Sequence, residues 1–242
     1  MGVVARGRVE GDGAFAAEWL FTDRRDGASA GEYASLNVGA SVGDDPEAVA
    51  ANRAIIAGYM GADALALVRQ VHGRDVARLN APVATPPDAD AVITDVPGLP
   101  IAVQTADCVP ILLADLDGGQ VAAVHAGWRG VVADVVGAAL DELAPGGPVH
   151  AWIGPAICPA CYEVSKEVRA QVSAVAPAAY AHTRIGTPAV DVRAGVAQQL
   201  LARGISAEMV GGCTFESEDL YSFRRDPVTG RQAGVIVLRE RS

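Results

Sequence analysis

Two histidines and a cysteine stand beside turn-forming residues in three separate apolar stretches of the chain. They are His72 in QVHG, Cys108 in TADCVP and His125 in VHAGWRG. Imidazole nitrogens and thiolates are ligands that zinc and copper accept. Three protein ligands would leave a fourth position for water or substrate, which is typical of a catalytic zinc site. The separations along the chain are long and match no local metal motif, so the residue types, not their spacing, suggest a metal centre.

Other interpretations of these residues remain open from the sequence alone. A lone histidine or cysteine at the end of an apolar strand often has a structural role, and a buried cysteine packs as a small hydrophobic residue. Cys108 could instead be a nucleophile with His125 as its base. Asp107 could orient either arrangement or cap a turn.

The stretch VHAGWRG also predicts an anion site. A strand, a glycine turn at Gly127 and a helix start leave backbone N–H groups free at the turn. Arg129 adds a fixed, forked cation. The alternative is that Arg129 pairs with a carboxylate and holds structure, and Trp128 is expected in the core or in a pocket wall.

The sequence pattern mixes strands with helices, and these elements must position the residues above. Such a mixture predicts an α/β layered fold. Apolar runs predict strands at 64–73 (ending at His72), 91–94, 100–104, 109–114 and 120–125, with others at 14–25, 34–45, 148–157, 207–215 and 231–240. Helical spacing predicts helices near 45–60, 131–144, 163–176 and 191–203. Asp45 is the expected N-cap of the first helix, Pro46 its first residue and Gly61 its end.

Composition narrows the functional classes. The chain has 242 residues, 50% of them hydrophobic, with a formal net charge of −10. Such a surface repels nucleic acid and anionic membranes, although a local basic pocket could bind a small anion. We find no signal-peptide core and no apolar run long enough to span a bilayer, so we expect a soluble, cytoplasmic protein. Cys158 and Cys161 form CPAC, but no second such pair follows, so we predict that both are structural.

Five motifs in order resemble a known family. They are QVHG, TADCVPILLAD, VHAGWRG, IGPAICPACYEV and YSFRRDPVTGRQAGVIVL. They are similar to the YfiH-type purine nucleoside phosphorylases, formerly described as multicopper polyphenol oxidases or laccase-domain proteins. The resemblance implies one domain over 1–242 with a layered α/β/β/α sandwich, in which mixed sheets have helices outside. It also implies a catalytic zinc on His72, Cys108 and His125.

The implied activities are phosphorolysis of adenosine, inosine, guanosine and methylthioadenosine, and deamination of adenosine. The partners would be a purine nucleoside and phosphate, bound by a monomer or small homo-oligomer. We expect Arg129 to hold the phosphate, with Asn37 and Gln70 as further substrate-binding groups. Gln70 would share a strand face with His72, and Arg53 would tie its helix to the sheet.

Two other activities remain as alternatives. Some similar proteins resemble amidases that edit a peptidoglycan precursor, and the same metal site would serve an amide. Copper polyphenol oxidation is less favoured, because such oxidases use many histidines and this chain has four.

Overall fold

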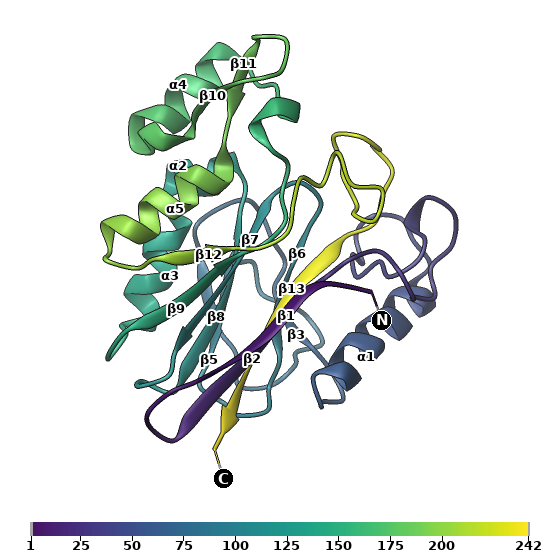
Figure 1. Ribbon diagram of the computed structural model, residues 1–242. Helices are drawn as coiled ribbons and strands as arrows, with labels where there is room; N and C mark the ends of the chain where they lie inside the picture. The colour runs from purple at the N-terminus through teal and green to yellow at the C-terminus, as the bar shows by residue number, and fades with distance from the viewer. Residues whose placement is uncertain (1, 242) are drawn as a thin grey trace.

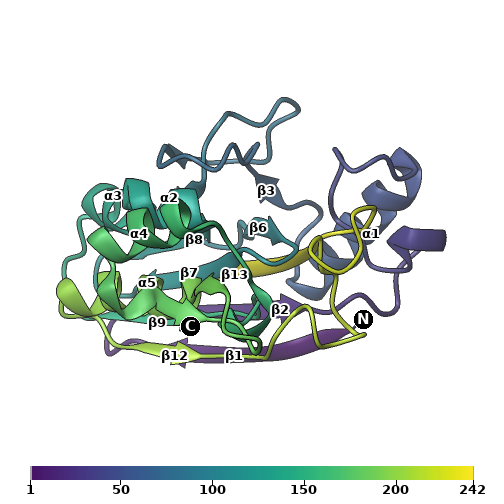
Figure 2. The ribbon, with the colours of Figure 1, turned by 90° about the horizontal axis from the view of Figure 1, so that it is seen from above.

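Two β-sheets stacked face to face form the centre of the molecule, and helices cover their outer faces (Figures 1 and 2). The structure is a computed structural model that describes residues 2–241. One sheet contains β1 (Val3–Glu10), β2 (Phe15–Thr22), β13 (Gln232–Glu240), β6 (Ile101–Thr105) and β3 (Ala66–Leu67), in that spatial order. The other contains β12 (Ala207–Met209), β9 (Val149–Ile153), β7 (Val109–Asp115), β8 (Gln120–Ala126), β5 (Ala91–Thr94) and β4 (Val76–Arg78).

The helices lie on opposite sides of the two sheets. Those with α geometry are α1 (Pro46–Tyr59), α2 (Trp128–Ala133), α3 (Val135–Leu143), α4 (Lys166–Val175) and α5 (Val192–Ala202). Three short 3₁₀ helices are η1 (Gly31–Tyr33), η2 (Pro159–Cys161) and η3 (Pro177–Ala179), and β10 (Tyr180–His182) forms a hairpin with β11 (Pro188–Val190). Figure 2 shows α1 on one side of the molecule and α2–α5 on the other.

Three buried clusters define the layers. The alternation along β8 is typical: Val121 and Ala123 pack between the two sheets, whereas Ala122 and Val124 pack under α2–α5. A third cluster lies between α1 and the five-stranded sheet. Because both faces of each sheet are covered, the central strands are apolar almost throughout. The arrangement confirms the predicted α/β/β/α sandwich with mixed sheets.

Most predicted helices form where their local signals place them. Asp45 caps α1 by accepting a hydrogen bond from the backbone N–H of Glu47, and Gly61 follows the helix with φ +65°. The single helix expected at 131–144 is two helices in the structure, α2 and α3. It is broken at Asp134, which has φ +58° and whose carboxylate caps α3 by accepting from the N–H of Gly137.

One predicted strand is much shorter in the structure, and another is absent. In the segment 64–73 only Ala66–Leu67 form a strand, so His72 lies in a turn and does not end a strand. The segment 34–45 contains no strand. Its backbone instead bonds to side chains, among them Asn52, which donates to the carbonyls of Ser35 and Asn37.

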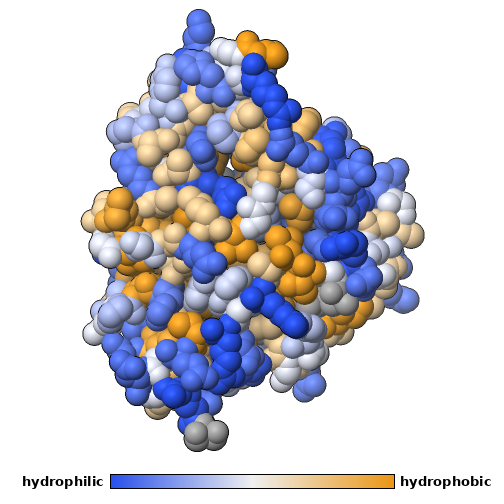
Figure 3. Space-filling view, in the orientation of Figure 1, coloured by the Kyte–Doolittle hydropathy of each residue, from blue (hydrophilic) through white to orange (hydrophobic). Residues whose placement is uncertain are grey.

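The face of the molecule shown in Figure 3 is a mosaic of hydrophilic and hydrophobic residues. None of the helices formed by residues 2–241 combines the length and apolar character needed to cross a bilayer.

Candidate active site

Strand pairing in the six-stranded sheet brings two of the predicted ligands together. β7 and β8 are antiparallel, with Val109 opposite Ala126, so Cys108 just before β7 lies beside the Gly127 turn that follows β8. β5 pairs with the other edge of β8, with Ala91 opposite Val124. This register places Asp90 next to His125, whose backbone N–H donates to the Asp90 carbonyl at 2.7 Å.

A turn folded around Asp90 supplies the third ligand. His72 has φ +61°, a conformation unusual for a residue with a side chain. The Asp90 carboxylate accepts hydrogen bonds from the backbone N–H groups of Val71, His72 and Gly73, at 3.3, 3.0 and 2.6 Å. These three bonds hold the turn and place the exposed His72 ring beside that of His125, with ring centroids 4.9 Å apart.

The donor set of His72, Cys108 and His125 fits a metal ion. One ligand atom from each lies within 4.8 Å of the others, and Cys108 Sγ is 3.9 Å from His72 Nε2. The fully buried Asp90 carboxylate also bonds His125 Nδ1 at 2.8 Å, which leaves His125 Nε2 as the ligand atom. A carboxylate behind a histidine in this way is typical of metal sites, because it fixes the ring and its tautomer.

The electrostatics of half-buried Cys108 and buried His125 favour metal binding. Burial would raise the pKa of the Cys108 thiol, but the imidazolium of His125 and hydrogen bonds from both histidines lower that pKa to about 6. Burial would lower the pKa of His125, but the Cys108 thiolate and Asp90 raise it to about 9. The thiolate is the form that binds metal, and a metal ion would take the place of the His125 proton.

Gly127 allows the backbone to approach the ligands closely. A Cβ atom at this position would lie 3.0 Å from Cys108 Sγ and 3.3 Å from His72 Cδ2. Its φ of −83° is open to any residue, so the requirement for glycine here is one of space.

The role of Asp107, open from the sequence, is to close the turn before Cys108. Its carboxylate accepts from Thr214 Oγ1 at 2.7 Å and from the Arg224 backbone N–H at 2.6 Å. Asp107 has φ +92°, and these bonds hold its backbone in that uncommon conformation.

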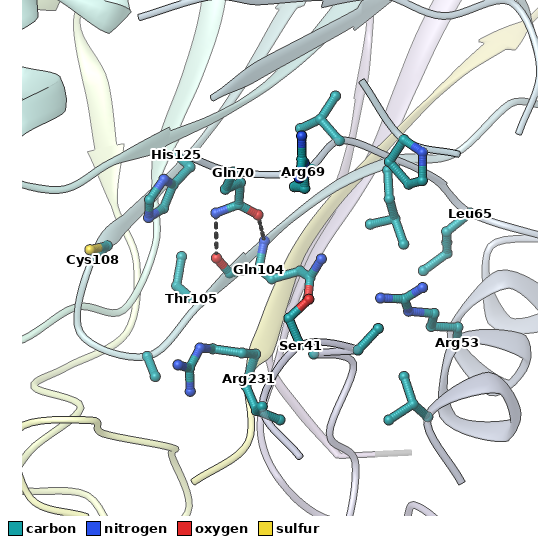
Figure 4. Close-up of a pocket in the computed structure, with 18 of the residues that line it drawn as sticks. Ser41, Arg53, Leu65, Arg69, Gln70, Gln104, Thr105, Cys108, His125 and Arg231 are labelled. Carbon is teal, nitrogen blue, oxygen red and sulfur yellow. Dashed lines mark hydrogen bonds between the residues drawn. The ribbon is translucent and has the colours of Figure 1, made fainter. Parts of the chain in front are cut away.

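The donor set opens onto a cavity of about 1060 Å³. Cys108 and His125 lie at one end, and Arg53 and Leu65 of the α1 side lie at the other (Figure 4). The charged side chains in its wall are Arg53, Arg69, Arg129, Arg224, Arg231, Asp63 and Asp107. A cavity rich in arginine inside a chain of net charge −10 is suited to a small anionic ligand.

Arg129 and Gln70 both line this cavity, but they differ in whether their polar groups are already hydrogen-bonded. Arg129 stacks on the Trp128 ring at 4.5 Å, and among residues 2–241 its guanidinium has no hydrogen bond or ion pair. Both amide atoms of Gln70 bond the backbone of Gln104 at 2.8 Å, as the dashed lines in Figure 4 show. Gln70 therefore forms part of the wall. Because residue 70 lies outside β3, the expected shared strand face with His72 does not exist.

Asn37 does not itself line the cavity, although two of its hydrogen-bond partners, Gly39 and Arg231, do. Its expected contact with substrate stays a prediction. Asn37 is fully buried, and its amide bonds Gly39, Asp44 and the backbone N–H of Arg231. Arg53, which we expected to tie α1 to the sheet, donates twice to the Val38 carbonyl, at 2.9 and 2.7 Å. It ties α1 to a loop instead, and it also lines the cavity.

Two residues of the site were missed from the sequence. Asp90 precedes an apolar run, and a buried aspartate there is a weak signal of a hydrogen-bonded role. Arg231 follows a Thr-Gly pair in the closing motif, and it lines the cavity while donating to the carbonyls of Thr229 and Gly230. Burial lowers the pKa of Arg231, although a guanidinium stays charged.

The model of a protein family described as multi-copper polyphenol oxidoreductase laccase matches residues 18–239. The chain belongs to this family. Proteins similar to it include a purine nucleoside phosphorylase of Streptomyces coelicolor, 51% identical over 92% of this chain and 96% of that protein. A purine nucleoside phosphorylase of Corynebacterium glutamicum is 42% identical over 90% and 93%.

Two solved structures have the same fold as this chain. A Neisseria meningitidis protein superposes with a TM-score of 0.84 and 33% identity, covering 97% of this chain and 99% of that one. YlmD from Geobacillus stearothermophilus gives a TM-score of 0.83 and 29% identity, covering 96% and 98%.

Proposed function

We propose that this protein is a zinc-dependent purine nucleoside phosphorylase that acts on adenosine, inosine, guanosine and methylthioadenosine and also deaminates adenosine. The observation that carries the proposal is a group of three potential metal ligands at the end of a large, arginine-lined cavity. Relatives named purine nucleoside phosphorylase, which align with about nine-tenths of this chain, support the same reaction.

Phosphorolysis needs an anion site beside the sugar and a wall for the base. A phosphate oxygen attacks C1′ of the ribose, the bond from C1′ to the base nitrogen breaks, and the base leaves with the bonding electrons and takes up a proton. The uncommitted guanidinium of Arg129 is suited to hold the phosphate, since its fork matches two phosphate oxygens. Trp128, Tyr162 and Phe223 contribute aromatic groups to the same cavity, where a purine could stack.

His72, Cys108 and His125 would hold the zinc ion, which supplies a Lewis acid when bound. Around it, the chain's own residues keep the ligands in place. Asp90 orients His125 and the His72 turn, and Asp107 holds the turn that presents Cys108.

The donor set does not favour multicopper oxidation. Copper oxidases of that kind use many histidines around several ions. Here His150 stacks on Trp152, with ring centroids 6.2 Å apart, and His182 bonds Arg169 at 2.9 Å. Only His72 and His125 contribute to the groups of potential ligands among residues 2–241.

The experiment is to incubate zinc-loaded protein with adenosine, with and without phosphate, and to separate the products by chromatography. Adenine and ribose 1-phosphate that form only with phosphate would support the phosphorylase. Inosine formed without phosphate would support the deaminase. If neither product appears from metal-loaded protein, the proposal fails, and the amidase activity on a peptidoglycan precursor becomes the one to test.

A variant of Arg129 tests the assignment of the phosphate site. For Arg129→Ala we expect the KM for phosphate to rise about tenfold or more, since a charge-assisted pair is lost, while the KM for nucleoside changes little. Steady-state kinetics with each substrate varied in turn give both values. Arg203→Ala is the control, because Arg203 pairs with Asp141 on the surface. An unchanged KM for phosphate in the Arg129 variant would exclude this residue as the phosphate ligand.

A further inference from the structure

A second group of potential metal ligands, made of three thiols, lies behind the turn that precedes Cys108. The Sγ atoms of Cys158, Cys161 and Cys213 all lie within 4.8 Å of one another, and each residue is half-buried. Cys158 is the N-cap of η2 and Cys161 its last residue. Cys213 comes from the segment after β12 and pairs with Ala156 in a parallel bridge. From the sequence we predicted a structural role for the CPAC pair because no second pair follows. The fold supplies the third thiol from a distant segment.

We propose that these three cysteines bind a zinc ion of their own, with Glu216 as the fourth ligand. In a tetrahedral zinc site with Zn–S bonds of about 2.3 Å, neighbouring sulfur atoms lie about 3.8 Å apart. The three thiols can reach that spacing by small side-chain adjustments. A sulfur and a carboxylate oxygen on one zinc ion lie about 3.6 Å apart, and Cys161 Sγ is 3.8 Å from Glu216 Oε1.

The surroundings of the cluster suit a charged metal site. The backbone N–H of Cys158 donates to Cys213 Sγ at 3.2 Å, a bond that stabilises a thiolate. Arg184 contacts the Glu216 carboxylate, and its positive charge would offset part of the negative charge of three thiolates and a carboxylate around Zn²⁺. A disulfide, by contrast, would join two of the thiols and leave the third without a role.

The position of the cluster indicates what the ion would stabilise. Thr214, next to Cys213, donates to the Asp107 carboxylate, and the N–H of Ile157, next to Cys158, donates to the Asp107 carbonyl at 3.0 Å. Asp107 in turn presents Cys108. The second zinc ion would therefore fasten together the two segments that support the catalytic turn.

The first test removes the catalytic ligands and keeps the cluster intact. The variant His72→Ala/Cys108→Ala is purified with a reducing agent that does not bind metal, and its zinc is measured by mass spectrometry of the metal. We expect about two zinc ions per chain in the wild type and about one in this variant. X-ray absorption at the zinc edge should then show three sulfur neighbours. A variant that holds no zinc, or zinc without sulfur ligands, would overturn the proposal.

The second test changes the cluster within that double variant. Cys213→Ser should remove the remaining zinc. Glu216→Gln should weaken zinc binding about tenfold or more in a competition with a chelator, whereas Glu218→Gln, its exposed neighbour, should not. Zinc retained at full affinity in Cys213→Ser would contradict the assignment. A disulfide found in the reduced double variant by denaturing mass spectrometry, as a loss of two hydrogens, would do the same.

Discussion

Asp90 positions both histidines of the candidate metal site. One of its oxygens bonds His125 Nδ1 and the N–H of His72, and the other bonds the N–H of Gly73. Burial would raise the pKa of this carboxyl, but His125 and the N–H groups hold it below its usual value. The carboxylate is therefore charged at neutral pH and can accept all of these bonds.

Replacing Asp90 by asparagine keeps the shape and removes the charge. The amide nitrogen would face an N–H group of the turn or the His125 ring, and one of these partners would lose its bond. We expect Asp90→Asn to weaken zinc binding about 10- to 100-fold, measured by chelator competition. Asp95→Asn is the control, since Asp95 is an exposed residue. Equal zinc affinity in both variants would mean that Asp90 does not support the metal site.

Gly127 permits a test of close packing at the same site. In Gly127→Ala the new methyl group would press on Cys108 Sγ and His72. We expect zinc affinity to fall about tenfold, while the free energy of unfolding of the metal-free protein changes by less than about 1 kcal/mol, because the backbone conformation suits alanine. Gly58→Ala in α1, where nothing lies within 4 Å, should leave zinc affinity unchanged. If Gly127→Ala binds zinc as tightly as the wild type, the added methyl group does not disturb Cys108 and His72.

His72, Cys108 and His125 could be identified from residue types and motifs. The carboxylate that positions the two histidines could not. Asp90 is 18 residues from His72 and 35 from His125, and no local pattern joins them. The strand register decides that they meet. The third thiol of the cysteine cluster was hidden for the same reason.

At the scale of elements, α1 holds the long loop that precedes it. Asn52 of α1 is fully buried and bonds the N–H of Ala28, the hydroxyl of Ser29 and the carbonyls of Ser35 and Asn37. One helical side chain thus satisfies backbone groups that a strand would otherwise have paired.

The loop should loosen when this side chain is shortened. Asn52→Ala leaves buried donors and acceptors without partners, so we expect the free energy of unfolding to fall by about 3 kcal/mol, measured by urea denaturation. Asn80→Ala, at an exposed position, should change it by less than about 0.5 kcal/mol. A similarly small change for Asn52→Ala would show that water replaces the lost bonds.

Elements with local signals were predicted well, and those set by distant contacts were not. Asp45, Pro46 and Gly61 mark the ends of α1, and the runs that form β5, β7 and β8 stand out as apolar. The segment 34–45 alternates like a strand, but its partner is the Asn52 side chain. The break at Asp134 was missed because the apolar spacing continues through it.

At the scale of the whole molecule, the packing between the two sheets should make them unfold together. Leu112 is fully buried in that interface, near Ala123 and Trp152 on the neighbouring strands. This prediction also tests whether 1–242 behaves as one domain.

Leu112→Ala leaves a cavity in this interface. We expect it to lower the free energy of unfolding by about 2–5 kcal/mol, with tryptophan fluorescence and circular dichroism reporting one shared transition. Leu201→Ala, whose side chain is 66% exposed, should have little effect. Two separate transitions would indicate that the sheets fold independently.

The place of β13 in its sheet has a consequence for synthesis. This strand lies between β2 and β6, although its residues 232–240 are synthesised later than the twelve strands β1 to β12. Until they emerge, β2 and β6 have no partner along those edges, and the apolar layer between the sheets stays open. Folding of this half of the sandwich must therefore wait until residues 232–240 have been synthesised, and before that point the chain exposes sheet edges and apolar surface that chaperones recognise.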